Sequence, residues 1–222
     1  MNLDIMSKQA IGIMGGSFNP IHIGHLVVAE EARVKYNLKK VIFIPVGIPG
    51  YKKRTKLIDP ERRFLMTLLA TVSNPYFYVS RIEIDRKGKC YTYDTIKELR
   101  EIYRYDEYDL YFITGADAVL SILTWKNPKE LLQMCYFIAA TRPGYSLKRL
   151  NEKLKKIGEC CKDRVFPLSV PALSISSTLI RERIKKGYTI KYLVPKEVED
   201  YIYKNNLYKE EDPWQEREKI EY

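Results

Sequence analysis

The two histidines of this 222-residue chain lie three positions apart in one glycine-rich stretch, residues 15–25 (GGSFNPIHIGH). The stretch follows a short apolar run and precedes an amphipathic one, so we expect it to join a strand to a helix. Gly15 and Gly16 let the backbone approach a ligand closely, and the free amides of the helix start favour a phosphate there. His22 and His25 can face one side and donate hydrogen bonds to phosphate oxygens whose charge grows in a transition state. The stretch therefore predicts a phosphate site in which both histidines are catalytic.

Neither a packing role nor one of the better-known nucleotide motifs fits this stretch as well. A single histidine is more often packed or exposed than functional, but here both histidines of the chain sit at one strand-to-helix junction. The Gly-x-Gly-x-x-Gly fingerprint of dinucleotide-binding domains is absent, and so is the Gly-Lys-Ser/Thr of a P-loop. We therefore interpret the stretch as a nucleotide site of another kind.

A second stretch, residues 175–181 (ISSTLIR), has the residue types of a phosphate cradle. Ser176, Ser177 and Thr178 are good N-cap candidates and offer hydroxyls and free amides at another helix start. Arg181 lies within reach of the same ligand and can grip a phosphate through two donors. Taken alone, the stretch is typical of an ordinary capped helix. Its functional interpretation depends on its pairing with the first stretch.

Short apolar runs alternate with longer amphipathic ones along the rest of the chain. We expect strands at residues 10–14, 41–45, 76–84, 109–114, 136–140 and 164–168. We expect helices at residues 26–36, 60–70, 93–103, 147–157, 177–186 and 195–205, and another after Asp117. Asp59, Pro60 and Glu61 have the order of an N-cap, a proline at the first helical position and an acidic first turn.

This alternation predicts an α/β fold, a Rossmann-like doubly wound parallel sheet with helices on both faces. The C-terminal helices should pack on the same domain, which we place at residues 1–208, with a charged tail at residues 209–222. Right-handed crossovers put the ligand crevice at the carboxyl ends of the strands. Both candidate stretches should face that crevice.

The charge balance favours an anionic ligand without specifying which one. The chain carries 38 Lys and Arg against 28 Asp and Glu, a formal charge of +10. Such an excess can reflect nucleic acid, a membrane surface or small anionic substrates, and a solvated basic surface accounts for most of it. One local run (Lys52, Lys53, Arg54 and Lys56) suits a polyphosphate substrate as well as nucleic acid.

The cysteines and the N-terminus bear on location and metal content. Cys90, Cys135, Cys160 and Cys161 form no Cys-x-x-Cys pair, so we expect no metal site made by the protein itself. Residues 1–9 lack the apolar stretch of a signal peptide, and no run approaches the ~18 apolar residues that span a bilayer. We expect a cytoplasmic protein with reduced thiols and no membrane partner.

The two stretches together resemble the His-x-Gly-His nucleotidyltransferase superfamily. Within it, the chain is most similar to the bacterial nicotinate-nucleotide adenylyltransferases, over residues 11–208. Four further segments match that family: residues 48–52 (IPGYK, where the family usually has Pro-Pro-His-Lys), residues 91–95 (YTYDT, preceded by Cys90 in place of Ser), residues 115–117 with Trp125, and residues 142–145 (RPGY). Tyr51 replaces the usual histidine, which leaves Lys52 and its basic neighbours to neutralise an acceptor phosphate.

The resemblance implies how ATP is held. His22 and His25 would hold its phosphates, with His25 nearest the reacting α-phosphate, and Ser177 and Arg181 would bind the β- and γ-phosphates. Arg181 would thereby join the histidines as a catalytic residue. The full ATP-binding set that the resemblance implies is Gly15, Gly16, Ser17, Phe18, His22, His25, Ile175, Ser176, Ser177 and Arg181.

The resemblance also implies an acceptor site for nicotinate mononucleotide. Thr92 and Trp125 would recognise the nicotinate ring, the indole by stacking. Asp117 would reach a ribose, Lys52 the acceptor phosphate, and Ser17 would lie beside the nucleotide. The implied reaction transfers AMP from ATP to nicotinate mononucleotide, giving nicotinate adenine dinucleotide and pyrophosphate in NAD biosynthesis. Mg²⁺ would arrive bound to ATP, since carboxylate ligands are few.

Three alternatives stay open at this point. Pantetheine-phosphate adenylyltransferases and cytidylyltransferases share the first motif, although Thr92 and Trp125 favour nicotinate. Nicotinamide mononucleotide is another acceptor that these residues allow. His-x-Gly-His is also a signature of class I aminoacyl-tRNA synthetases, but no Lys-Met-Ser-Lys-Ser-like loop is present, so we expect no nucleic-acid partner. A homo-oligomer is left open.

Overall fold

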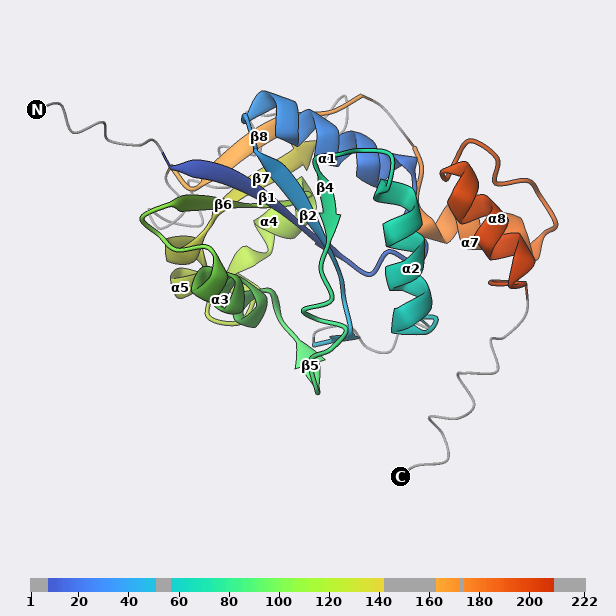
Figure 1. Cartoon of the computed structure of the whole chain (residues 1–222), viewed down its shortest axis with the longest axis horizontal. Helices are drawn as coiled ribbons and strands as arrows, with labels where there is room; N and C mark the ends of the chain where they lie inside the picture. The colour runs from blue at the N-terminus through green and yellow to red at the C-terminus, as the bar shows by residue number, and fades with distance from the viewer. Residues whose placement is uncertain (1–7, 51–56, 142–162, 172–173, 210–222) are drawn as a thin grey trace, which may run out of the picture. The chain divides into compact units, whose positions relative to one another are not determined.

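The computed structural model describes residues 8–50, 57–141, 163–171 and 174–209 (Figure 1). Contacts divide the chain into two compact units: the first comprises Met1–Met14, Ala29–Ile42 and Tyr91–Pro171, and the second comprises Gly15–Val28, Phe43–Cys90 and Ala172–Tyr222. Several expectations lie outside the described residues: Tyr51, Lys52 and their basic neighbours, the RPGY segment, the helix at residues 147–157, Cys160, Cys161, and the tail from residue 210.

A six-stranded sheet in the order β4-β2-β1-β6-β7-β8 forms the centre of the fold. Its strands are β1 (Gln9–Gly16), β2 (Lys40–Pro45), β4 (Phe77–Val79), β6 (Tyr108–Gly115), β7 (Tyr136–Thr141) and β8 (Val165–Ser169), and β3 (Ile48–Pro49) pairs with β5 (Lys89–Cys90) apart from them. The pairs β1–β6, β6–β7 and β7–β8 are all parallel. The predicted Rossmann-like parallel sheet is confirmed.

The strand order reverses at β1. The chain passes from β1 to β2 and β4 on one side, then returns to β6, β7 and β8 on the other. Ligands of open parallel sheets bind outside the carboxyl end of such a switch-point strand. The carboxyl end of β1 is Gly15–Gly16, the start of the first candidate stretch.

The inner strands are buried on both faces. Residues 11–14 of β1 and 41–45 of β2 are all buried, which is why their sequences are continuous apolar runs instead of alternating ones. Within the first unit, Figure 1 shows residues 29–35 of α1 on one side of β1 and α3 with α5 on the other. The helices are α1 (Ile23–Lys35), α2 (Pro60–Thr71), α3 (Thr92–Ile102), α4 (Ala116–Leu120), α5 (Pro128–Met134), α7 (Ser177–Lys185) and α8 (Lys196–Lys204).

Two helix starts have the predicted caps. The Asp59 carboxylate accepts the N–H of Glu61 at 2.8 Å before α2, and the Ser176 hydroxyl accepts the N–H of Leu179 at 3.1 Å before α7. The first helix differs from expectation, since α1 begins at Ile23 and not at residue 26. Its first turn therefore contains the Ile23-Gly24-His25 segment itself.

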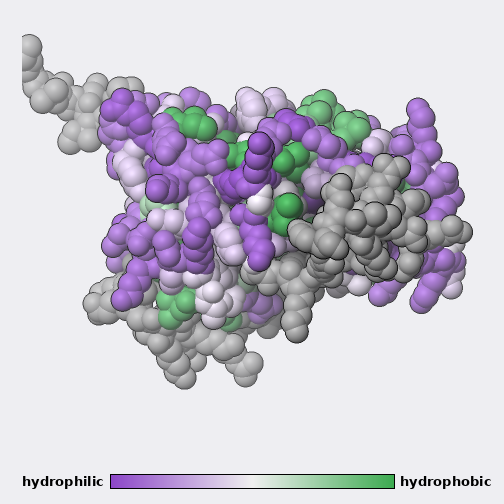
Figure 2. All heavy atoms as spheres, turned by 90° about the horizontal axis from the view of Figure 1, so that it is seen from below, coloured by the Kyte–Doolittle hydropathy of each residue, from purple (hydrophilic) through white to green (hydrophobic). Residues whose placement is uncertain are grey.

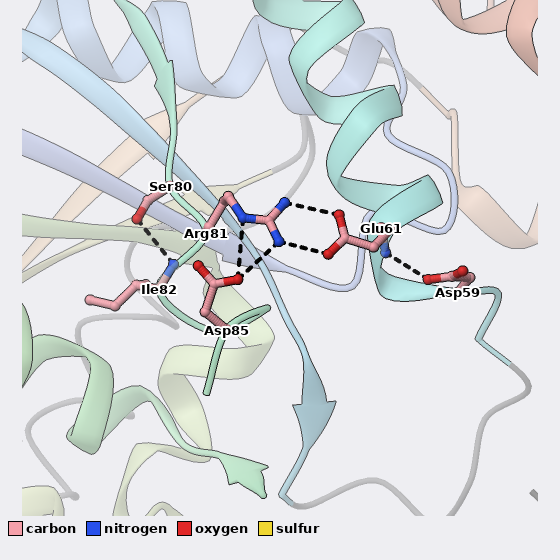
Figure 3. A network of polar contacts seen from close by, with 6 residues as sticks. All are labelled: Asp59, Glu61, Ser80, Arg81, Ile82 and Asp85. Atoms are coloured by element: carbon pink, nitrogen blue, oxygen red, sulfur yellow. Dashed lines mark hydrogen bonds and ion pairs between the residues drawn. The ribbon is translucent and has the colours of Figure 1, made fainter. Parts of the chain in front are cut away.

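The strand expected at residues 76–84 is wrong in length, because β4 ends at Val79. The chain then turns, and the backbone N–H of Asp85 bonds to the Arg81 carbonyl at 2.9 Å. Arg81 donates to both oxygens of Glu61 on α2 at 2.6 and 2.9 Å and to Asp85 (Figure 3). These ionic hydrogen bonds hold the turn to α2 and hold the pKa of Glu61 below its ordinary value.

Among the residues coloured in Figure 2, most of those visible are charged or polar, and apolar ones form small groups. None of the helices in the described part of the chain is both long and apolar enough to cross a membrane.

Candidate active site

The two histidine rings stack at the start of α1. Their centroids lie 3.7 Å apart with 27° between the ring planes. The backbone N–H of His22 donates to Nδ1 of His25 at 3.2 Å. Because Nδ1 is an acceptor here, the proton of the neutral His25 ring resides on Nε2. His25 can therefore donate a hydrogen bond to a ligand through Nε2.

Gly24 makes this stacking sterically accessible. A Cβ atom at Gly24 would lie 3.0 Å from Nδ1 and 3.1 Å from Cε1 of His22. These distances are tighter than about nine in ten real Cβ contacts, so a side chain here would push the His22 ring away by a few tenths of an ångström. The glycine in the His-x-Gly-His pattern therefore makes room for the first histidine.

Burial keeps both rings uncharged near neutral pH. It lowers the pKa of His22 to about 4. The pKa of His25 is also lowered well below its ordinary value, first by burial and then by the neighbouring charge of protonated His22. Nδ1 of His22 is buried and has no hydrogen-bond partner among the described residues. A buried polar atom without a partner is costly, so this nitrogen is suited to meet a ligand.

Phe18 also packs against His25. Its ring meets the imidazole edge-on, with centroids 5.1 Å apart and 85° between the planes. A Cβ atom at Gly16 would lie 3.0 Å from the Phe18 ring, so the second glycine leaves room for it. Phe18 itself has a φ of 43° and is almost fully buried. The ring of His25 thus contacts two other rings, those of Phe18 and His22.

The structure brings the two candidate stretches together within one unit. The Ser177 hydroxyl donates to the carbonyl of Pro20 at 2.8 Å, and the Arg181 guanidinium donates to the carbonyl of Asn19 at 2.8 Å. The carbonyl of Ile175 would lie 3.9 Å from a Cβ on Gly24. The start of α7 is therefore fastened to the start of α1, although 157 positions separate Ser177 from Pro20 in the sequence.

The donors at α7 differ from the expected ones in one respect. The Ser177 hydroxyl hydrogen is used on Pro20, so what this residue can offer an anion is its backbone N–H. Ser177 and Thr178 lie in the first turn of α7, where backbone N–H groups have no acceptor within the helix itself. Arg181 uses two of its five N–H donors on Asn19 and Thr178. The remaining donors, with the helix dipole, suit a phosphate.

Two residues near this site were not predicted. Arg63 on α2 is fully buried and donates to the carbonyls of Ile58, Ser17 and Gly47. Tyr208 donates its hydroxyl to Oδ1 of Asn19 at 3.0 Å. A signal for Arg63 does exist, because it lies three residues before the buried Met66 on the apolar face of α2.

Three expected acceptor residues belong to the other unit. Thr92 is the first residue of α3, and Asp117 is exposed in the first turn of α4. Trp125 is half-buried and meets Phe112 and Phe137 edge-on, with centroids 6.1 and 6.2 Å apart. The fourth, Lys52, lies outside the described residues.

An ion pair links the surroundings of Thr92 and Trp125. Lys126 donates to both oxygens of Asp94 at 2.7 and 2.9 Å. Its ammonium also lies 5.1 and 5.7 Å from the ring centres of Tyr91 and Tyr93. The segment after Trp125 is thereby fixed to the start of α3, so the two residues expected to recognise the ring share one part of this unit.

The described residues contain no group of three or more His, Cys, Asp or Glu side chains that could hold a metal ion.

Solved structures share this fold. A Plasmodium falciparum nicotinic acid mononucleotide adenylyltransferase, solved with NaAD, superposes with a TM-score of 0.71 at 23% identity and covers 90% of this chain and 97% of its own. The same enzyme solved with APC gives a TM-score of 0.70 over the same shares. At this identity the likeness concerns the fold.

Sequence relatives are much closer. The chain is 55% identical over 202 residues to a protein of Thermoanaerobacter sp. (strain X514) named "Probable nicotinate-nucleotide adenylyltransferase", covering 91% of this chain and 95% of the relative. It is 56% identical over 209 residues to a protein of the same name from Moorella thermoacetica, covering 94% and 95%.

The parallel sheet and the two helix starts at its switch point define a nucleotidyltransferase. The family described as cytidylyltransferase-like matches residues 13–183. The chain belongs to this family, and within it to the nicotinate-nucleotide adenylyltransferases, as the sequence motifs predict.

Proposed function

We propose that the protein transfers the AMP part of ATP to nicotinate mononucleotide, releasing pyrophosphate and forming nicotinate adenine dinucleotide. One observation carries the proposal: the start of α7 is hydrogen-bonded to the stretch that holds the stacked histidines. Two helix starts side by side present free amides, imidazole and guanidinium donors to one polyphosphate. The names of the close relatives support nicotinate mononucleotide as the acceptor.

The donors divide between the phosphates of ATP. His25 donates through Nε2 to the α-phosphate, and His22 offers the buried Nδ1 beside it. The amides of Ser177 and Thr178 and the guanidinium of Arg181 hold the β- and γ-phosphates. Negative charge grows on these oxygens in the transition state, where fixed donors stabilise it most. Gly15, Gly16 and Ser17 let the nucleotide lie against the end of β1.

The reaction needs no covalent intermediate with the protein. An oxygen of the acceptor phosphate attacks the α-phosphorus, a new P–O bond forms, and the bond to the bridging oxygen of the β-phosphate breaks. The electron pair of that bond leaves with pyrophosphate. Catalysis rests on alignment of the two phosphates and on charge stabilisation by the donors above.

We propose that Mg²⁺ enters with ATP as part of the substrate. When bound, it neutralises charge on the phosphate oxygens. The described residues fit this arrangement, because the donors at both helix starts are N–H groups that bind phosphate oxygens and leave the metal to the phosphates themselves.

We assign recognition of the acceptor to four residues: Thr92, Trp125, Asp117 and Lys52. The exposed part of the Trp125 indole stacks on the nicotinate ring, and Thr92 with the first amides of α3 meets its carboxylate. Asp117 reaches a ribose, and Lys52 neutralises the acceptor phosphate. The Asp94–Lys126 ion pair supports this assignment, because it fixes the segments of Thr92 and Trp125 to each other.

An acceptor screen tests the proposal. Pyrophosphate release from ATP and Mg²⁺ is measured with nicotinate mononucleotide, nicotinamide mononucleotide and phosphopantetheine in turn. Nicotinate mononucleotide should give the highest kcat/KM. Turnover with phosphopantetheine alone would move the protein to another branch of its family. Salt-dependent RNA binding without acceptor-dependent pyrophosphate release would contradict the proposal altogether.

A further inference from the structure

We propose that Tyr208 and Arg63 are positioning residues, which hold the turn at residues 17–19 so that its Phe18 ring orients His25. The inference rests on the proposed function, since it concerns the aim of the imidazole that meets the α-phosphate. Neither residue belongs to the two motifs, and all the atoms concerned lie in one unit.

Phe18 occupies a backbone conformation that its residue type disfavours. Its φ of 43° lies in the left-handed region, where a bulky side chain is uncommon. Such a conformation persists when the surrounding structure over-determines it. The φ value places the ring of Phe18 against His25, with 1% of the residue exposed. The contacts that fix this turn therefore also fix the neighbour of the catalytic imidazole.

Arg63 fixes the turn on the side that precedes Phe18. Its guanidinium donates to the carbonyl of Ser17 at 2.9 Å, and its other bonds reach Ile58 at 3.0 Å and Gly47 at 3.2 Å. All three acceptors are backbone carbonyls from different segments. Burial lowers the pKa of Arg63 to about 10, so the group stays charged at neutral pH and its hydrogen bonds are charge-assisted.

Tyr208 fixes the turn on the side that follows Phe18. Its hydroxyl donates to Oδ1 of Asn19 at 3.0 Å, and both residues are buried, with 7% and 2% exposed. The preceding Leu207 is also buried, and its N–H bonds to the carbonyl of Ile202 on α8 at 3.0 Å. The segment after α8 is thereby connected to the turn at residues 17–19, although Tyr208 and Asn19 are 189 positions apart in the sequence.

Asn19 is thus held at two points. The Arg181 guanidinium donates a hydrogen bond to its backbone carbonyl, and the Tyr208 hydroxyl donates one to its side-chain carbonyl. Arg181 faces the phosphates, whereas Tyr208 is buried, so loss of the Tyr208 bond changes the turn without removing a ligand contact. This difference separates positioning from binding in an experiment.

The test is Tyr208→Phe, which removes one oxygen and keeps the ring. Its matched control is Tyr192→Phe. Tyr192 and Tyr208 both have a positive φ (65° and 66°), but Tyr192 is 81% exposed. We expect kcat for pyrophosphate release to fall about tenfold in Tyr208→Phe, as for a lost buried hydrogen bond. The KM for ATP and for nicotinate mononucleotide should stay within about twofold, because no ligand contact is lost. The control should match the wild type.

A second readout is independent of turnover. The chain has two histidines, so the imidazole ¹⁵N signals of the ligand-free protein can be assigned with a single His22→Asn variant. We expect the His25 nitrogens to shift in Tyr208→Phe and in Arg63→Lys, which keeps the charge but loses the fork of three donors. A variant that is merely less stable would keep the wild-type signals in its folded fraction.

Two outcomes would overturn the inference. One is a Tyr208→Phe variant with normal kcat, and the other is a set of unshifted His25 signals in both variants. If the wild type releases no pyrophosphate with nicotinate mononucleotide, the proposed function fails instead, and the imidazole signals still decide the positioning role.

Discussion

At the scale of single residues, His25 has one nitrogen to offer a substrate. Nδ1 accepts the amide proton of His22, so the donor must be Nε2. Gly24 permits the arrangement because its missing Cβ leaves room for the His22 ring. The spacing of the two histidines therefore has a steric reason as well as a chemical one.

His25→Ala should leave the fold intact and nearly abolish turnover. Removal of one preorganised donor to a transition-state charge typically costs ~10²–10³ in rate. Steady-state pyrophosphate release with saturating ATP measures the loss, and circular dichroism checks the fold. A near-normal turnover number in a folded variant would refute the assigned role.

The buried histidines should also make the protein acid-sensitive. The pKa of His22 is about 4 in the folded chain and 6.5 in the unfolded one. Below pH 6.5, His22 is protonated in the unfolded chain but stays neutral in the folded chain. The free energy of unfolding therefore falls as the pH is lowered. From pH 6.5 to 5, His22 should contribute a loss of about 2 kcal/mol.

Urea unfolding of the wild type and of His22→Asn over this pH range checks the prediction. The variant should lose stability less steeply than the wild type. Parallel pH profiles for the two proteins would show that His22 protonates equally well in both states.

At the scale of elements, α7 begins where the sequence predicts it, and α1 begins three residues earlier than expected. Ser176 caps α7, and the Ile23-Gly24-His25 segment forms the first turn of α1. Local sequence predicts such starts because a cap needs only its neighbouring amides. The strand expected at residues 76–84 was too long, because the chain turns at residues 81–85, where Arg81 bonds to Asp85 and to Glu61 of α2.

The Asp59 cap should contribute measurably to stability. Asp59→Ala removes the acceptor for the Glu61 amide, which typically costs about 1 kcal/mol. Chemical unfolding measures the change, with Glu31→Ala, at an exposed position inside α1, as the control. A difference between the two variants within experimental error would mean that the α2 start is held by its other contacts.

The Asp94–Lys126 ion pair should affect the acceptor and not ATP. Lys126→Met frees the Trp125 segment from α3, so the KM for nicotinate mononucleotide should rise several-fold while the KM for ATP stays unchanged. The charge-exchanged pair, Asp94→Lys with Lys126→Asp, should restore part of the loss. An equal rise in both KM values would argue against a role confined to the acceptor.

At the scale of the whole molecule, the sequence predicts the parallel sheet because alternating runs and short connections leave few topologies. It also predicts that both motifs face one edge, and the bonds from Ser177 and Arg181 to Pro20 and Asn19 join them. The hydrogen-bond partners of Arg63 and Tyr208 could not be assigned in advance, although the position of Arg63 on α2 indicates its burial. Ser17 lies 46 positions from Arg63 and Asn19 lies 189 positions from Tyr208, and no local pattern encodes such pairings.

The most direct test of the account is a crystal structure of the protein with a non-hydrolysable ATP analogue. We predict an α-phosphate oxygen about 3 Å from Nε2 of His25, with the outer phosphates on the amides of Ser177 and Thr178. A triphosphate bound away from both helix starts would contradict it.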